Sequence, residues 1–325
     1  KTDCNNQVIT FGYDSLNRLT AKNLPVGDAV TYTYDNWDNA LAVSSTPLTV
    51  TYRYDLLNRR TDEAHVFADF PTTTYNIHRS YDGAGNVVSL TDAVGRTITN
   101  AYTPRHLLGS VRYNNQALAT YTYNSMGRPV SAAYGNVVST TYSYDQLNRA
   151  TKIETKNPVG MTVWKQEYDY DAESDRVLMR ENDTRLVTYT YDELEQLLGL
   201  QITSLTSGIT STLAYAYDIW GNRQSYTTPL DVTAYTYAPD SNELTGYAVN
   251  NSLTVTSTYD GNGSLTRETV TNGGAPIRTV NYTWDSQNRL SAISYLDGSQ
   301  PTFLPQALTN TVNYAYDDYG NRIKK

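Results

Sequence analysis

Polar and apolar residues alternate along most of this chain, and one short phrase interrupts the alternation at regular intervals. Stretches such as "VSTTYSYD", "LVTYTYD" and "TNTVNYAYD" place Tyr, Val and Thr side chains two residues apart. Residues i and i+2 of a strand lie on the same face of a sheet, so this period predicts β-strands. The period of about 3.6 residues that an amphipathic helix requires is missing. The pattern therefore predicts an all-β chain.

The interrupting phrase consists of an aromatic residue, one variable residue, a second aromatic residue and then usually Asp. "FGYDSLNRLT" at Phe11 returns as "YRYDLLNRRT", "YSYDQLNRAT" and "YTWDSQNRLS". Fourteen copies occur, with second aromatics at Tyr13, Tyr34, Tyr54, Tyr81, Tyr102, Tyr123, Tyr144, Tyr170, Tyr191, Tyr217, Tyr237, Tyr259, Trp284 and Tyr316. Most successive copies lie 20 to 22 residues apart. Asp follows in eleven copies, among them Asp14, Asp35, Asp55, Asp82, Asp145, Asp192, Asp218, Asp285 and Asp317. We interpret these aromatic and aspartate residues as structural repeat positions.

The four residues that begin at this Asp have the composition of a tight turn. Asp is favoured at the first position of a type I turn, where its carboxylate can accept from backbone N–H groups two and three residues on. Gly and Asn tolerate the left-handed conformation that follows such a turn in a three-residue hairpin loop. They occupy the fourth position nine times, at Asn17, Asn58, Gly85, Gly127, Asn148, Gly221, Gly263, Asn288 and Gly320, and Asp38 is a tolerable tenth. The phrase therefore predicts a hairpin.

The spacing of the phrase predicts how the hairpins assemble. About 21 residues per copy leave two strands of roughly six to eight residues, and hairpins that stack bury each other's edges. Fourteen hairpins give about 28 strands and, at ~4.8 Å per strand, a sheet about 130 Å wide, which must curl because strands twist. We predict one continuous array over residues 1–325 without a separate catalytic domain. Its sheet would be curved or spiral and form part or all of a hollow β-shell.

Composition supports a thin sheet rather than a thick core. The chain has 30 Tyr against 4 Phe, a hydrophobic fraction of 39% and a mean hydropathy of -0.54. The phrase uses thirteen tyrosines at its second aromatic position and ten at its first. A tyrosine ring can pack while its hydroxyl contacts water or a partner. The net charge of -8 argues against a nucleic-acid partner, and no apolar run approaches the ~20 residues of a membrane helix.

Candidate chemical groups are sparse. The repeated aspartates resemble paired catalytic carboxylates, but the turn already explains them. "DGAGN" at Asp82 and "DGNGS" at Asp260 look like calcium loops, yet Thr271 stands where an EF-hand needs Glu. The three histidines, His65, His78 and His106, lack the spacing of metal ligands, and Cys4 is the only cysteine. We expect no catalytic, cofactor-binding or metal-binding residues, no cofactor and no enzymatic activity.

The phrase resembles the YD repeat of the RHS family, which includes shell components of bacterial Tc toxins, bacterial polymorphic toxins and the teneurin adhesion proteins. The matching residues extend from Phe11 to Arg322. The resemblance implies a hairpin strip that coils into a hollow shell and, in the toxin branch, a core segment that cleaves the chain and leaves a C-terminal toxin enclosed. This sequence has no Asp-Pro dipeptide and nothing like that core segment after Tyr316. No self-cleavage residue is therefore carried over.

Two functional hypotheses follow. In the first, the chain is a shell segment that encapsulates a C-terminal toxin or effector, and its partner is that effector domain or the remainder of the shell. In the second, it is an extracellular adhesion module that binds glycan or protein through the insertions between phrases, such as "HVFADFPTTT", and through exposed aromatics such as Trp164 and Phe303. Both hypotheses place the protein outside the cell or on its surface. The chain opens and closes like a piece of a longer protein, and neither nucleic acid nor a membrane span is expected.

Overall fold

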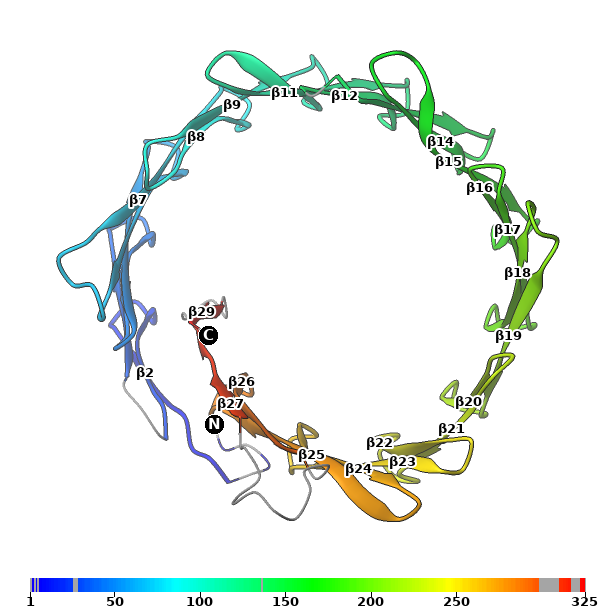
Figure 1. Cartoon of the computed structure of the whole chain (residues 1–325). Coiled ribbons are helices and arrows are strands. Elements are labelled where there is room, and N and C mark those ends of the chain that lie inside the picture. The colour runs from blue at the N-terminus through cyan, green and yellow to red at the C-terminus, as the bar shows by residue number, and fades with distance from the viewer. Residues whose placement is uncertain are drawn as a thin grey trace. The chain divides into compact units, whose positions relative to one another are not determined.

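A computed structural model of the chain describes residues 2, 4, 6–25, 29–135, 137–297, 310–316 and 322–324 (Figure 1). Every regular element within these residues is a β-strand, which confirms the all-β prediction. Asp317, Gly320 and Phe303, which the sequence singles out, lie outside the described residues.

The strands of the described residues follow one another along the chain. They are β1 (Thr10–Tyr13), β2 (Leu19–Asn23), β3 (Val30–Tyr34), β4 (Ala40–Ser44), β5 (Leu48–Tyr54), β6 (Arg60–Phe67), β7 (Tyr75–Tyr81), β8 (Val87–Thr91), β9 (Thr97–Tyr102), β10 (Leu108–Tyr113), β11 (Gln116–Tyr123), β12 (Pro129–Tyr134), β13 (Ser139–Tyr144), β14 (Ala150–Lys156), β15 (Thr162–Tyr170), β16 (Arg176–Glu181), β17 (Arg185–Tyr191), β18 (Leu197–Ser204), β19 (Thr210–Tyr217), β20 (Arg223–Thr227), β21 (Val232–Tyr237), β22 (Leu244–Val249), β23 (Leu253–Tyr259), β24 (Leu265–Asn272), β25 (Ala275–Trp284), β26 (Leu290–Asp297), β27 (Asn310–Asn313), β28 (Ala315–Tyr316) and β29 (Arg322–Lys324). The sequence predicts about 28 strands, and the described residues contain 29, because β27 and β28 are separate. They are divided at Tyr314, whose N–H donates to the carbonyl of Ser291 (2.8 Å).

Strands that follow one another in sequence pair antiparallel, as tandem hairpins require. Strands β1 to β27 belong to one 27-stranded sheet, and β28 and β29 form a two-stranded sheet. The contacts between residues divide the chain into two compact units. The first unit comprises Lys1–His78, Asp92–Val94 and Tyr235–Lys325. The second unit comprises Arg79–Thr91 and Gly95–Ala234. Within the second unit, the strands from β8 to β20 follow one another along a curved sheet (Figure 1). The prediction of a curved array of hairpins is therefore confirmed for this unit.

Burial in both units is concentrated on the sheet face that carries the tyrosines of the phrase. In the second unit, Tyr168 lies opposite Met179 and Met179 lies opposite Val187 in successive strand pairs. All three are buried and contact Ile153 and Leu200 from the neighbouring strands. A similar cluster in the first unit contains the buried residues Val30, Val43, Leu48, Val50 and Tyr52. Side chains on this face bury one another through cross-strand pairs, which is how a thin sheet stabilises itself.

The other face of β14 and β15 carries charges in alternation. Lys152 pairs with Glu167 across the strands, and Glu154 pairs with Lys165. The Glu154 carboxylate accepts from the Thr162 hydroxyl (2.7 Å) and lies 3.1 Å from the Lys152 amine. These contacts lower the pKa of Glu154 to about 2. This face is therefore polar and ion-paired, while the tyrosine face carries the buried apolar cluster.

Trp164 corrects one expectation from the sequence. The sequence predicts an exposed ring in the insertion that contains Trp164. Instead Trp164 lies within β15, paired with Thr155 of β14, and its side chain is half-buried. The reason is local: Asn157 and Gly160 close a tight turn, so the residues from Thr162 onward already belong to the return strand.

Candidate functional site

The phrase places a tight turn at the end of each odd-numbered strand up to β25. In an antiparallel series of hairpins, alternate connections lie on the same edge of the sheet. We call this row of turns the turn edge: residues 14–18, 35–39, 55–59, 82–86, 103–107, 124–128, 145–149, 171–175, 192–196, 218–222, 238–243, 260–264 and 285–289. The structural repeat aromatics are the last residues of their strands, namely Tyr13, Tyr34, Tyr54, Tyr81, Tyr144, Tyr191, Tyr217, Trp284 and Tyr316. Each repeat aspartate within the turn edge is the first residue of its turn.

The turn at Asp14 shows the hydrogen bonds that recur along the edge. Its backbone N–H donates to the carbonyl of Arg18 (3.0 Å), and the N–H of Asn17 donates to the carbonyl of Asp14 (3.0 Å). The Asp14 Oδ1 atom accepts from the N–H groups of Leu16 (3.0 Å) and Arg18 (2.9 Å). The sequence predicts that this carboxylate accepts from the N–H groups two and three residues on. The bond from Leu16, two residues on, is confirmed, and the bond from Asn17, three residues on, is wrong. The N–H of Asn17 already donates to the Asp14 carbonyl, so the carboxylate accepts from Leu16 and Arg18, two and four residues on.

The fourth turn position adopts the left-handed conformation that the sequence predicts. Its φ lies between 60° and 89° at Asn17, Asp38, Asn58, Gly85, Gly127, Asn148, Gly221, Gly263 and Asn288. The strand register shifts beside these turns, for example between Gly12 and Tyr13, as expected for a bulge. His106, Ser174 and Glu195 also have positive φ at this position. The sequence analysis missed these three, because hairpin geometry there overrides a residue type that disfavours the conformation.

In several turns, the side chain at the fifth position bonds to the next turn. The Arg18 Nε donates to Asp14 Oδ2 (2.7 Å), and its Nη1 donates to the carbonyl of Asp35 in the following turn (2.7 Å). The Arg18 guanidinium also lies over the Tyr34 ring, 5.0 Å from its centroid. Arg149 repeats this arrangement in the second unit. Its Nε donates to Asp145 Oδ2 (2.7 Å), and its Nη1 donates to the carbonyl of Asp171 in the next turn (3.0 Å). Its guanidinium lies 4.7 Å from the centroid of the Tyr170 ring. One guanidinium thus binds its own carboxylate, the next turn and the next aromatic ring.

The second aromatic of the phrase donates a hydrogen bond to the preceding hairpin. The Tyr34 hydroxyl donates to the carbonyl of Leu19 (2.9 Å). The β2–β3 ladder begins only at Ala21 and Thr31, so the Leu19 carbonyl lies beyond it and accepts the hydroxyl instead. The corresponding bonds, between 2.7 and 3.0 Å, are made by Tyr34, Tyr54, Tyr102, Tyr123, Tyr144, Tyr170, Tyr191, Tyr217, Tyr259, Trp284 and Tyr316. Trp284 uses its indole N–H. Phenylalanine has no such donor, which explains why the second aromatic position holds Tyr or Trp.

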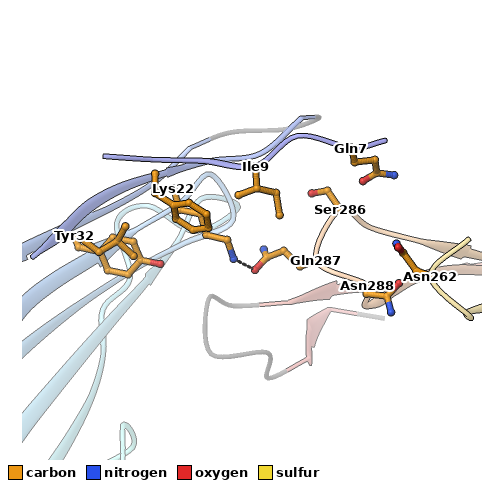
Figure 2. A pocket seen from close by; sticks show the side chains of 10 residues that line it. Gln7, Ile9, Lys22, Tyr32, Asn262, Ser286, Gln287 and Asn288 are labelled. Carbon is orange, nitrogen blue, oxygen red and sulfur yellow. Dashed lines mark hydrogen bonds between the residues drawn. The ribbon is translucent and has the colours of Figure 1, made fainter. Parts of the chain in front are cut away.

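The N-terminal segment covers one part of the turn edge in the first unit. The N–H of Cys4 donates to Asn262 Oδ1 (3.0 Å), and the Lys22 amine donates to Gln287 Oε1. Figure 2 shows this Lys22–Gln287 contact beside a cavity of about 580 Å³ that is also lined by Tyr32. We call this contact the N-terminal seam. Sequence reasoning missed it because its partners are more than 250 residues apart.

The third turn position differs between covered and uncovered turns. At the N-terminal seam it is polar, Asn262 or Gln287, and its side chain bonds to the N-terminal segment. In several other turns it is large, apolar and about 70% exposed, at Leu16 (68%), Trp37 (74%), Leu57 (68%), Met126 (70%), Leu147 (67%), Leu194 (77%) and Trp220 (72%). Arg105 and Glu173 are polar at the same position in other turns, so this position alone does not predict the seam.

The histidines make small, separate contacts. His65 Nε2 lies 3.3 Å from Glu63 Oε2, and His78 Nδ1 lies 2.8 Å from Asp62 Oδ1. Among the residues that the structure describes, no group of three or more His, Cys, Asp or Glu side chains is arranged to hold a metal ion. In the same part of the chain, no helix is long and apolar enough to cross a membrane.

The chain matches known families and folds. The family model for the teneurin YD-shell matches residues 75–324, and the RHS repeat model matches residues 13–47. The crystal structure of TcdB2-TccC3-Cdc42 is similar, with a TM-score of 0.66 and 17% identity, over 94% of this chain and 20% of that chain. The Tc holotoxin pore of Photorhabdus luminescens is similar with a TM-score of 0.66 and 17% identity, over 96% of this chain and 19% of that chain. No curated protein matches the sequence.

A third similar structure is TcdB2-TccC3 without its hypervariable C-terminal region, with a TM-score of 0.52 and 15% identity, over 94% of this chain and 21% of that chain. At these identities the likeness shows the fold. The chain spans about a fifth of the length of these neighbours.

Replacing Tyr144 with Phe tests the bond between hairpins. The Tyr144→Phe variant leaves the Pro129 carbonyl without its 2.7 Å donor. We expect the free energy of unfolding to fall by about 0.5–1.5 kcal/mol, measured by urea denaturation. The Tyr13→Phe variant is the matched control, because Tyr13 belongs to the first phrase and its side chain is 56% exposed. Equal effects of the two substitutions would contradict the role of the bond.

The turn carboxylates make stability depend on pH. The Arg149 N–H and guanidinium hold the pKa of Asp145 below its usual value, and the pKa values of Asp14, Asp35, Asp55, Asp82 and Asp218 are lowered as well. A lowered folded-state pKa contributes stability that is present above the unfolded value of about 3.9 and is lost as the pH falls through the folded value. We expect Asp145→Asn to destabilise the protein at pH 7, with a difference from the unmodified chain that vanishes as the pH falls from about 4 towards 2.

Asn124 provides the converse control. Its Oδ1 accepts from the N–H groups of Met126 (3.0 Å) and Arg128 (2.9 Å), so Asn can form this turn without charge. The Asn124→Asp variant should therefore add stability at pH 7 that disappears over the same pH range. Denaturation curves collected from about pH 2 to 7 measure both variants. If the difference in unfolding free energy between either variant and the unmodified chain did not change with pH, the role given to the turn carboxylates would be wrong.

The N-terminal seam can be tested with the native cysteine. In the Asn262→Cys variant, the new thiol lies where the Asn262 side chain accepts from Cys4, so mild oxidation should join it to Cys4 by a disulfide in the folded protein. Non-reducing gels and peptide mass spectrometry detect this cross-link. The Trp37→Cys variant, at the same turn position of an uncovered turn, should remain reduced. Similar cross-linking of both variants would show that the seam is not a specific contact.

Proposed function

The chain belongs to the teneurin YD-shell family, and on this premise we propose that it is a wall segment of a shell that encloses an effector carried by the C-terminal part of the same protein. A shell-like structural role rests on the family and on the shared fold. Enclosure of an effector is the further step. The observation that carries it is the connection between consecutive hairpins, which recurs within each of the two units.

A wall must resist opening between its parts, and the turn edge supplies two kinds of connection between hairpins. A tyrosine hydroxyl bonds to the preceding hairpin, as Tyr170 does to the Ala150 carbonyl (2.8 Å). An arginine such as Arg149 binds its own turn and the next one. These bonds add to the strand ladders where the ladders end. A cargo behind such a sheet would meet few gaps.

The neighbours support a cargo at the C-terminus. One solved complex is TcdB2-TccC3 without a hypervariable C-terminal region, and another joins TcdB2-TccC3 to Cdc42. A constant shell with a variable C-terminal region fits a container better than a fixed catalytic machine. We also propose that the segment itself catalyses no reaction and that its parent protein is secreted or displayed at the cell surface.

The proposal is tested on the natural full-length parent protein by limited proteolysis and by mass spectrometry under native and denaturing conditions. We expect the C-terminal region to remain with the repeats natively and to resist protease until denaturant opens the shell. If the folded parent exposes its C-terminal region to protease as readily as a free peptide, enclosure is wrong. The shell-like fold would then serve another purpose.

A further inference from the structure

The N-terminal seam brings the two ends of the hairpins together within the first unit. The N–H of Cys4 donates to Asn262 Oδ1 (3.0 Å), and the amine of Lys22 donates to Gln287 Oε1. Asn262 and Gln287 stand at the third position of turns on the turn edge. Lys22 is the next-to-last residue of β2, which begins after a turn of that edge and ends away from it, and Cys4 precedes β1 at the same far end. At the seam, the turn edge is therefore covered by the opposite end of a hairpin.

The opposite ends of the hairpins form a row of their own, which we call the connection edge. In the second unit it comprises the connections at residues 114–115, 135, 137–138, 157–161, 182–184, 205–209 and 228–231. Several of these connections expose large apolar side chains, between 65% and 88% accessible: Val159, Met161, Ile209 and Leu230. The connections at residues 114–115 and 182–184 are polar and interrupt the row.

The turn edge of the second unit carries a similar row. Four of its turns expose a large apolar side chain at the third position: Met126, Leu147, Leu194 and Trp220. Glu173 and Arg105 interrupt this row, and the Arg105 guanidinium donates to carbonyls of the next turn (2.7 Å). Single exposed apolar residues are normal on a protein surface, whereas groups of them mark interaction sites. Both ends of these hairpins therefore have the character of an interaction surface.

The spacing of the two rows restricts what can cover them. Each row repeats once per hairpin, which is the width of two strands or about 10 Å. A partner that meets several turns at once needs this period and the curvature of the sheet in the second unit (Figure 1). A second copy of this chain has both, because it is the same array of hairpins.

We propose that copies of this chain associate head to tail, with the turn edge of one second unit against the connection edge of another. The seam supplies the precedent, because a turn and the far end of a hairpin already meet there. The seam is polar on both sides, and the proposed contact is apolar on both sides. The proposal rests on the shell-like fold and does not depend on enclosure of an effector.

A head-to-tail contact uses two different surfaces, so a pair of copies does not close on itself. Each pair leaves one turn edge and one connection edge exposed, and further copies can add to them. The net charge of -8 opposes association through repulsion between copies, and salt screens that repulsion. We therefore expect species larger than dimers, favoured by high protein concentration and by salt.

Sedimentation velocity of the 325-residue chain in about 0.5 M salt tests this association. We expect the weight-average sedimentation coefficient to rise with protein concentration beyond the value of a dimer. If the chain stays monomeric at every concentration, the edges belong against other repeats of the parent protein and the proposal is wrong. Association that stops at a dimer would indicate a symmetric contact and would also overturn it.

Two variants identify the surfaces. The turn-edge variant introduces glutamine, the residue that Gln287 supplies at the seam: Met126→Gln, Leu147→Gln, Leu194→Gln and Trp220→Gln. The connection-edge variant changes the other row in the same way: Val159→Gln, Met161→Gln, Ile209→Gln and Leu230→Gln. All eight side chains are exposed, so both variants should fold, which circular dichroism checks. Each variant alone should associate at least about tenfold more weakly than the unmodified chain.

A mixture of the two variants is the matched control. The turn-edge variant keeps an intact connection edge, and the connection-edge variant keeps an intact turn edge. The mixture should therefore form dimers of one copy of each variant, and these dimers should not grow. Undiminished association of either folded variant alone would show that its row is not a contact surface. A mixture that stays monomeric would show that the two edges do not bind each other, and either result refutes the proposal.

Discussion

The hydrogen bond from an aromatic side chain to the preceding hairpin is the interaction on which the rest of this structure depends. Each turn is followed by a bulge, and beside the bulge the ladder between hairpins ends, so that a carbonyl such as that of Leu19 lies beyond it. A backbone carbonyl without a partner is costly. The ring of Tyr34 fills the space between the hairpins and its hydroxyl supplies the donor. Repetition of this one solution accounts for the Tyr or Trp at the second aromatic position of the phrase.

Much of the fold could be predicted from the sequence because its causes are local. The alternation that gives strands and the Asp-to-Asn spacing that gives the turn at Asp14 each act within a few residues. The partner of the Tyr34 hydroxyl could not be predicted, because it lies fifteen residues earlier in another hairpin. The contact between Cys4 and Asn262 is still less accessible, since 258 residues separate them. The positive φ of Glu195 also follows from hairpin geometry rather than from its residue type.

The two edges of the hairpins serve different purposes. On the turn edge, the same few contacts recur, and Arg18 and Arg149 make equivalent bonds in different units. On the other edge, the connections vary in length and chemistry. A repeated phrase thus fixes how hairpins join, while the insertions between phrases are free to differ.

The central claim is that side chains of the turn edge hold consecutive hairpins together. Hydrogen exchange of a triple variant, Tyr123→Phe, Tyr144→Phe and Tyr170→Phe, measured by mass spectrometry, tests it most directly. The account predicts that amides of β10 to β15 near the turn edge exchange about two to ten times faster, while β17 to β19 stay protected. Unchanged exchange in β10 to β15 of the folded variant would show that the ladders alone join the hairpins, and would contradict the account.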